Sequence, residues 1–255
     1  MDGMIEALKD TLGSFSKPVI CFSGGLDSTV LLRNAMGYCD DPVALFVRLP
    51  MNTSRQIDSA ERIAEYLGIG LRIEEIRWDE LSGMENNPQE RCYICKSAIY
   101  RKAKEIASSC GADAVLAGDN ADDKDSERPG HRAAAENGIR NPLKEAGVGK
   151  SAVISAIEEM GLPVPMFKDT CMATRYPFDH PIGEKEFRFT EECESAVRKI
   201  SGLKQLRIRI DGNRALVQTD EKELPNMIRF RTQITYELKS RGLDCDLDLN
   251  AYNLS

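Results

Sequence analysis

Apolar runs alternate with amphipathic stretches along most of the chain. An apolar run at Lys17–Ser23 predicts a buried strand, and three further strands are predicted at Pro42–Leu49, Leu71–Trp78 and Ala112–Asp119. The stretches between them have helical periodicity and predict helices, at Ser28–Cys39, Ser54–Ile69 and Tyr93–Gly111. Strands that alternate with helices of this length are typical of a doubly wound parallel sheet. The first part of the chain is therefore predicted to have an α/β, Rossmann-like fold.

The pattern changes after a polar stretch at 120–132, which we interpret as a loop, and a helix predicted at Lys150–Gly161. Pro163 and Pro165 indicate a domain boundary. Beyond them the sequence predicts helices near 190–200 and 222–241, and strands at 205–210, 214–218 and 245–249. We therefore expect one domain over residues 1–165 and a second, smaller α+β domain over residues 166–255.

Composition and charge narrow the class of protein. The chain has 255 residues, of which 42% are hydrophobic and 29% charged, as in ordinary globular proteins. It has no apolar run of 18 residues, and acidic residues near its start oppose a targeting signal, so we expect a cytoplasmic protein without a membrane span. The net charge of −7 disfavours a nucleic-acid partner. The segment from Lys185 to Arg241 is more basic, which suits a phosphorylated or carboxylated small ligand as well as RNA.

The motif SGGLDS, between the first predicted strand and helix, indicates an anion-binding loop. Gly24 and Gly25 let the backbone approach an anion, and the helix N-terminus adds its positive end. The hydroxyls of Ser23 and Ser28 can donate to phosphate oxygens, and Asp27 can hold Mg²⁺ or position a leaving group. The loop lacks the GxxxxGK[ST] pattern, and with it the phosphate-binding lysine of a Walker A loop. It resembles the loop of the PP-loop ATP pyrophosphatases, which implies binding of ATP and its cleavage to AMP and pyrophosphate.

A second motif, AGDNADD, closes the fourth predicted strand. It is similar to the second nucleotide-side motif of the same superfamily, which makes Asn120, Asp122 and Asp123 candidates for contacts to nucleotide, metal or substrate. Taken alone the motif is weak, because an acidic loop is usually just solvated.

The eight cysteines are expected to be reduced thiols, metal ligands or catalytic groups. Cys92 and Cys95 have CxxC spacing, which fits a redox pair, half of a zinc site, part of an iron–sulfur site, or two small buried residues. Cys171 lies in a proline-containing loop, where positive groups would favour a thiolate; the alternative is a buried structural cysteine. Three basic or titratable residues lie near it in sequence: Lys168, Arg175 and His180.

The motifs together resemble those of LarE-type proteins, the ATP-dependent sulfur transferases of nickel-pincer cofactor synthesis. The resemblance covers roughly Val19 to Leu224 and includes RCYICK, GDNADD, GIRNPL, KDTC and LRIRI in the family's order. One branch of the family sacrifices the sulfur of a single cysteine at the position of Cys171. In the other branch, thiolates at the positions of Cys92, Cys95 and Cys171 hold a [4Fe–4S] cluster whose fourth iron carries a sulfide.

This chain has all three cysteines, so it resembles the cluster-bearing branch. A three-cysteine site leaves one iron open, whereas structural zinc would need a fourth ligand. The candidates for that fourth ligand are His131, His180 and Cys193.

Arg207 and Arg209 are two residues apart in LRIRI and are therefore expected on one face of a strand. The resemblance makes them clamps for a phosphate or carboxylate of the pincer precursor, a pyridinium dicarboxylate mononucleotide; the alternative is an ordinary charged strand face. Arg214 is a weaker third candidate. Three positions depart from the family pattern: Thr174 replaces a serine, Asp179 a glycine and Gln218 a carboxylate. If that carboxylate binds metal or orients substrate, its loss puts the substrate in doubt.

The resemblance implies a sulfur transferase that adenylates a small carboxylated or phosphorylated substrate. Its cofactors would be ATP, Mg²⁺ and a [4Fe–4S] cluster, its sulfur would come from sulfide or another donor, and it would form a homo-oligomer. Asp27, Cys171, Arg207 and Arg209 would carry the chemistry. Two alternatives stay open: a tRNA-thiolating enzyme of the same superfamily, and a non-catalytic nucleotide-binding Fe–S or zinc protein.

Overall fold

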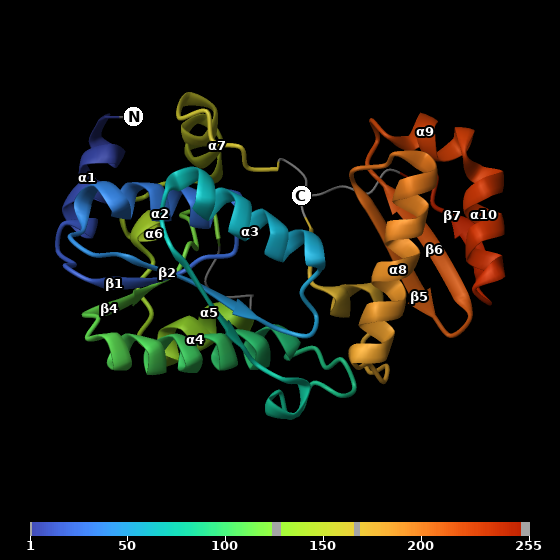
Figure 1. Cartoon of the computed structure of the whole chain (residues 1–255), viewed down its shortest axis with the longest axis horizontal. Coiled ribbons are helices and arrows are strands. Elements are labelled where there is room, and N and C mark those ends of the chain that lie inside the picture. The colour runs from blue at the N-terminus through green and yellow to red at the C-terminus, as the bar shows by residue number, and fades with distance from the viewer. Residues whose placement is uncertain (1, 124–128, 166–168, 251–255) are drawn as a thin grey trace. The chain divides into compact units, whose positions relative to one another are not determined.

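The computed structural model describes residues 2–123, 129–165 and 169–250. These residues belong to two compact units, shown in Figure 1. Unit 1 consists of Met1–Leu49, Ser54–Ser82 and Glu90–Met166. Unit 2 consists of Pro50–Thr53, Gly83–Gln89 and Phe167–Ser255. The sequence predicts one continuous domain over residues 1–165, whereas two short segments within that range belong to unit 2.

Unit 1 contains a four-stranded sheet. Its strands are β1 (Pro18–Cys21), β2 (Val43–Arg48), β3 (Leu71–Glu75) and β4 (Ala114–Leu116). Its helices are α1 (Asp2–Leu12), α2 (Leu26–Tyr38), α3 (Ser54–Leu67), η1 (Trp78–Glu80), α4 (Arg91–Cys110), α5 (Pro129–Glu136), α6 (Pro142–Glu145) and α7 (Lys150–Glu159). The strand order is β3-β2-β1-β4, and every pairing is parallel. The predicted α/β fold with a parallel sheet is confirmed.

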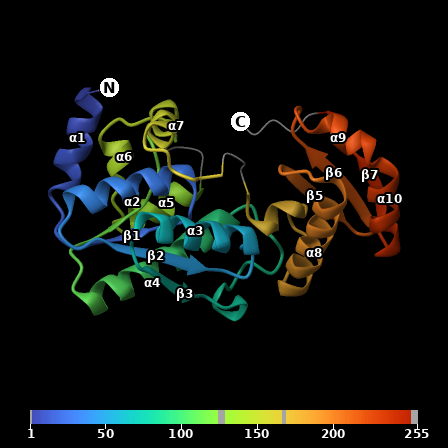
Figure 2. The ribbon, with the colours of Figure 1, turned by 45° about the horizontal axis from the view of Figure 1, so that its top comes forward.

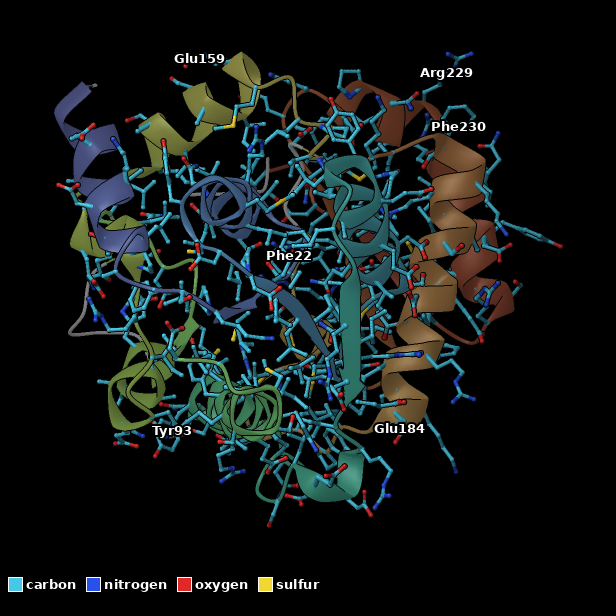
Figure 3. The ribbon with its side chains drawn as sticks, turned by 60° about the vertical axis from the view of Figure 1, so that its left-hand side comes forward. Phe22, Tyr93, Glu159, Glu184, Arg229 and Phe230 are labelled. Carbon is cyan, nitrogen blue, oxygen red and sulfur yellow. The ribbon has the colours of Figure 1, made fainter. Side chains whose placement is uncertain are left out.

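The central strand β1 explains the apolar runs in the sequence. Val19 pairs with Val43 of β2 on one side and with Val115 of β4 on the other, and it is fully buried. Helices cover both faces of the sheet: α2 and α3 lie on one face and α4 on the other (Figure 2). Figure 3 views α2 and α4 nearly end-on, with the strands between them and Phe22 at the end of β1. A strand covered on both faces must be apolar along its whole length.

The strand order also fixes where a ligand can bind. The chain proceeds from β1 to β2 and β3 in one direction and then returns to place β4 on the other side of β1. The connections therefore diverge between the carboxyl ends of β1 and β4, which is the topological switch point of the sheet. The loops that follow β1 and β4 meet at this point.

Unit 2 is a smaller α+β unit with a three-stranded sheet. Its elements are η2 (Met172–Arg175), α8 (Glu184–Ser201), β5 (Leu206–Asp211), β6 (Arg214–Thr219), α9 (Leu224–Arg229), α10 (Arg231–Ser240) and β7 (Asp244–Leu247). β5 and β6 form an antiparallel hairpin, and β7 adds parallel to β6. The apolar face of this sheet carries Ile208 and Val217, both fully buried, with α8 packed on β5 and α10 on β7.

Two predictions about local structure were wrong. The single helix predicted near 222–241 is divided into α9 and α10 at Phe230. The stretch at 120–132 is not all loop, because α5 begins at Pro129, a residue whose fixed φ suits the first turn of a helix. In the part of the chain that the structure describes, no helix has the length and apolar character needed to cross a membrane.

Candidate functional site

The loop between β1 and α2 has the geometry of an anion-binding site. Gly24 has φ of +70°, and a Cβ there would lie 2.7 Å from the backbone nitrogen of Ala60 in α3, so only glycine fits. The hydroxyl oxygens of Ser23 and Ser28 lie 3.0 Å apart. The N-cap residue of α2 is Gly25, and no side chain caps the helix there. The first N–H groups of α2 are therefore available to an anion.

Asp27 is held between two side chains at the switch point. Asn120, after β4, donates from Nδ2 to Asp27 Oδ1 at 2.9 Å. Lys150, the first residue of α7, donates from Nζ to Asp27 Oδ2 at 2.5 Å. The role of Lys150 cannot be predicted from the sequence, because it lies 123 residues from Asp27 and at the start of a helix that carries no motif. It supplies the positive charge that the loop itself lacks.

The acidic residues after β4 shape this loop. Asp122 Oδ2 accepts a hydrogen bond from the backbone N–H of Lys150 at 2.6 Å, so Asp122 fixes the start of α7. Asp123 Oδ2 accepts from the backbone N–H of Asn120 at 3.0 Å. The contacts of Asp122 and Asp123 with their own chain position Asn120 and Lys150 around Asp27.

Lys96, which directly follows Cys95 in unit 1, is half-buried. Its ammonium group lies 3.1 Å from a carboxylate oxygen of Asp119, in the loop that follows β4. Burial alone would lower the pKa of Lys96, but the neighbouring Tyr100 and Asp119 outweigh it and raise that pKa. His131 of α5 also faces Asp119, at 3.8 Å. Sequence reasoning missed Lys96 because its partner lies on another element.

The CxxC pair begins α4. Cys92 is exposed and Cys95 is half-buried; being three residues apart in a helix, they share a face. Tyr93, labelled in Figure 3, donates to Glu136 of α5 at 2.5 Å, and the guanidinium of Arg132 lies 4.1 Å from the Tyr93 ring centre. These contacts hold the start of α4 against α5.

Cys171 belongs to unit 2, in the segment that leads into η2. Thr174, which stands where the family has serine, donates from Oγ1 to the carbonyl oxygen of Cys171 at 2.7 Å. The fully buried Asn87 donates from Nδ2 to the carbonyl oxygens of Ala173 at 3.1 Å and Pro177 at 2.7 Å. These bonds fix the backbone around the thiol, which is half-buried.

The surroundings of Cys171 differ from the positive loop expected. Arg175 is only 1% exposed and is ion-paired with the fully buried Glu194 of α8, with Nε 2.7 Å from Oε1. Glu194 is also bound by Arg198 at 2.9 Å. The His180 ring stacks on Tyr176, and Lys168 lies outside the described residues. Glu194 therefore neutralises the charge of Arg175, and the ion pair holds η2 to α8.

Asp179 explains a departure from the family pattern. Its φ is +56°, in the left-handed region, so a glycine at this position meets no steric conflict. Aspartate is among the few residues that tolerate this conformation.

Arg207 and Arg209 lie on one face of β5, as predicted, but in different environments. Arg207 is 5% exposed, and burial lowers its pKa to about 10, with Arg175 and Arg209 adding to the effect. Arg209 is exposed and lines a cavity of about 380 Å³, together with Tyr176 and Arg214. Gln218 is the direct cross-strand partner of Arg207. The departure at Gln218 therefore falls beside the predicted clamp.

Three of the other cysteines, Cys21, Cys39 and Cys193, have thiols whose pKa is raised by burial. Burial raises the pKa of Cys21 to about 12 and that of Cys39 and Cys193 to about 11. Cys193, considered above as a fourth zinc ligand, is fully buried in α8. Among the residues that the structure describes, no three His, Cys, Asp or Glu side chains gather as a metal site. Cys92 and Cys95 belong to unit 1 and Cys171 to unit 2, so the three-thiol site stays a prediction.

Comparisons with known proteins place these features in context. No family model matches the chain. It is 26% identical over 231 residues to an uncharacterized protein of Synechocystis sp., which covers 90% of this chain and 86% of the relative. It is also 26% identical over 253 residues to the pyridinium-3,5-bisthiocarboxylic acid mononucleotide synthase of Lactiplantibacillus plantarum, covering 98% of this chain and 90% of that enzyme.

A partial match extends the comparison. The chain is 24% identical over 163 residues to a protein of Methanobrevibacter smithii named probable tRNA sulfurtransferase, covering 59% of this chain and 42% of that protein. The chain is thus similar over nearly its whole length to a LarE-type synthase, and over part of it to a tRNA sulfurtransferase, which confirms the resemblance predicted from its motifs.

Proposed function

We propose that this chain is an ATP-dependent sulfurtransferase that activates a carboxylate of a small substrate and replaces one of its oxygens by sulfur. The observation that carries the proposal is the arrangement of Asn120 and Lys150 around Asp27, beside a glycine loop at the switch point. The similar synthase of Lactiplantibacillus plantarum supports it, because its name describes a product with sulfur on its carboxyl groups.

The loop would hold the anionic end of ATP. The N–H groups at the start of α2 and the hydroxyls of Ser23 and Ser28 are donors for phosphate oxygens. Lys150 already neutralises Asp27, so bound phosphate and Mg²⁺ would provide new partners for both groups. Asp27 would then hold Mg²⁺ while Lys150 binds phosphate.

The reaction then follows two substitutions. A carboxylate oxygen of the substrate attacks the α-phosphorus of ATP, and pyrophosphate leaves. A sulfur nucleophile attacks the carbonyl carbon of the acyl adenylate, and AMP leaves with one former carboxylate oxygen. Neither step changes the oxidation state of the substrate carbon. Arg207 and Arg209 would bind the substrate through its anionic groups, since a guanidinium suits both carboxylate and phosphate.

Cys171 would take part in delivering the sulfur. It is half-buried in a segment held by Thr174 and Asn87, and η2 packs against β5, which carries both arginines. With Cys92 and Cys95, it would supply the three thiolates that a [4Fe–4S] cluster needs, and each of the three thiols is at least partly exposed. When bound, such a cluster would supply an open iron that carries a sulfide.

The nucleotide half of the proposal is tested by pyrophosphate release from ATP. The assay uses aromatic dicarboxylate mononucleotides as acceptors and sulfide as the donor. Lys150→Met is expected to lower kcat/KM by about 100-fold, the typical loss for one positioned donor to a developing charge. Lys104→Met, which removes an exposed lysine from α4, is the matched control and should leave the rate unchanged. Absence of AMP and pyrophosphate with every acceptor would refute the proposal.

The proposed role of the cysteines in sulfur delivery is tested by measuring the metal content of the purified protein. Anaerobic iron and acid-labile sulfide are measured on the wild type, on Cys171→Ala and on the control Cys110→Ala. About four irons per chain, lost only in Cys171→Ala, is the expected result. Zinc in place of iron would make the thiols a structural site. Absence of both metals would indicate that Cys171 gives up its own sulfur.

The partial similarity to a tRNA sulfurtransferase favours a second candidate, thiolation of tRNA. The net charge of −7 opposes it. Gel-shift titration with bulk tRNA separates the two candidates. Tight, salt-sensitive binding would favour tRNA, and no shift at micromolar protein would favour the small substrate.

A further inference from the structure

The four-stranded sheet of unit 1 has two edges, and they differ in what lies beside them. Beyond β4, the backbone of Leu116 forms a parallel bridge with Arg140. Beyond β3, at the opposite edge, no residue in the described part of the chain joins the sheet, and Figure 2 shows β3 as its outermost strand. An edge of this kind presents unpaired N–H and C=O groups, to which a strand of another chain can pair.

The pairing of β3 with β2 determines which of its backbone groups face outward. The N–H of Ile76, directly after β3, donates to the carbonyl oxygen of Arg48 in β2 at 2.9 Å. Successive residues of a strand turn their N–H and C=O groups to opposite sides. The even-numbered residues of β3 therefore face β2, and the odd-numbered residues, with Ile73 at their centre, face away from the sheet.

The side chains of β3 are exposed and include both signs of charge. Ile73 is 40% exposed. Arg72 and Glu74, on either side of it, share the other face of the strand and form a salt bridge, with Nε 2.8 Å from Oε1. Because both charged side chains are partly exposed, this salt bridge adds little to the stability of a single chain. Charged residues on an edge strand oppose pairing with most other strands, so the order of the charges decides which strand can pair.

A second copy of β3, in antiparallel orientation, has the matching order of charges. A two-fold axis at Ile73 places this residue opposite its own copy, and the outward N–H and C=O groups of the pair then exchange both hydrogen bonds. Arg72 lies opposite Glu74 of the second copy, and Glu74 lies opposite Arg72 of the second copy. The four charged side chains alternate in sign around the axis, so the nearest neighbours of each charge are opposite charges.

The same side chains disfavour the neighbouring registers. Residues that lie opposite each other in a sheet point to the same face, so a two-fold axis must pass through a residue position. An axis at Arg72 would place two guanidiniums opposite each other, and an axis at Glu74 would do the same with two carboxylates. Like charges directly opposite each other destabilise a sheet. The charge order of β3 therefore favours the register centred at Ile73.

We propose that the outer edge of β3 is an interaction surface for a second copy of this chain, and that the two copies form one continuous sheet across a two-fold axis at Ile73. Such a contact uses the same surface on both copies and closes on itself, so it adds one copy and no more at this edge. The inference goes beyond the proposed function, because it uses neither the glycine loop nor the arginines of β5.

Sedimentation velocity on the full chain, over a range of concentrations and without ATP, tests the proposal. The wild type, with a mass of 28.4 kDa per chain, should form a particle of two chains or of a larger even number. Arg72→Glu and Glu74→Arg should each weaken this association at least about tenfold, because each places like charges opposite each other on both sides of the axis. Arg101→Glu makes the same charge change at an exposed position of α4, so this matched control should leave the association unchanged.

Mixing the two variants distinguishes a loss of pairing from a loss of folding. In a mixed pair, the two carboxylates of the Arg72→Glu chain lie opposite the two guanidiniums of the Glu74→Arg chain. The mixture should therefore associate more tightly than either variant alone, which two misfolded chains would not do. A wild type that is a monomer or an odd-numbered particle, single variants that associate as tightly as the wild type, or a mixture that does not recover association would overturn the proposal. Because ATP is absent, a failure of pyrophosphate release would refute the proposed function without changing this result.

Discussion

The ion pair of Arg175 and Glu194 allows a quantitative prediction about unit 2. Glu194 accepts from Arg175 Nε at 2.7 Å, from Arg198 at 2.9 Å and from the backbone N–H of Ile208 at 3.1 Å. Arg175 is 1% exposed and Glu194 fully buried. Glu194→Gln keeps the shape but removes the nearer carboxylate from a buried guanidinium, which then keeps only Asp169, at 3.6 Å. Removing one partner of a buried pair costs about 3–5 kcal/mol.

Urea unfolding followed by circular dichroism measures this loss. With a slope of about 1–3 kcal/mol per molar urea, the midpoint should fall by more than about 1 M. Glu192→Gln is the matched control, because Glu192 lies two residues away in α8, is 59% exposed and faces Arg241 at a distance of 4.0 Å. It should cost less than about 0.5 kcal/mol. A loss below about 1 kcal/mol in Glu194→Gln, or equal losses in both variants, would refute the reasoning.

The same pair predicts a dependence on pH. Burial would raise the pKa of Glu194, but Arg175 and Arg198 outweigh it and hold that pKa below the ordinary value of 4.5. The unfolded chain therefore binds the proton more readily than the folded chain. The stability that Glu194 contributes is present above pH 4.5 and is lost as the pH falls through the folded pKa. Wild type should lose stability below pH 4.5 more steeply than Glu194→Gln.

Three further predictions concern single positions. Iodoacetamide at pH 8 should alkylate the exposed Cys92 well before Cys193, whose pKa burial raises to about 11; equal rates by mass spectrometry would contradict the packing. Asp179→Val should cost more than about 1 kcal/mol in thermal unfolding because φ is +56°, whereas Asp179→Gly should be neutral or stabilising. Gly24→Ala should abolish ATP binding in calorimetry while Gly25→Ala weakens it less, since only the first Cβ would clash with the α3 backbone; equal effects would argue against the loop geometry.

The parallel sheet of unit 1 could be predicted because its cause is local. A strand such as β1 is apolar along its length since helices cover both of its faces, and glycine and helical periodicity mark where it ends. The glycine loop was found for the same reason: its residues adjoin one another in sequence. The positions of Arg207 and Arg209 on one face of β5 follow from simple alternation.

The partners of these residues could not be predicted from the sequence. Hydrophobic periodicity indicates which side chains are buried, but it does not indicate which residues they contact. Lys150 reaches Asp27 across 123 residues, and Asn87 reaches Ala173 across 86. Arg175 looked like a positive neighbour of Cys171, and only the fold shows that Glu194 neutralises it. The division of the predicted helix at Phe230 leaves no clear signal in the sequence.

The buried amide of Asn87 has a consequence for how the chain must be synthesised and dissected. Asn87 lies in the Gly83–Gln89 segment, far upstream of the backbone it holds, and both belong to unit 2. During synthesis this segment leaves the ribosome before η2 is translated. Asn87 can therefore donate to the carbonyl oxygens of Ala173 and Pro177 only after those later residues have emerged. Cutting the chain at residue 165 would separate these partners. The first fragment would contain the Asn87 amide without its acceptors, and the second would contain the Cys171 segment without its donor. When the two fragments are mixed, Asn87→Ala in the first fragment should weaken their association.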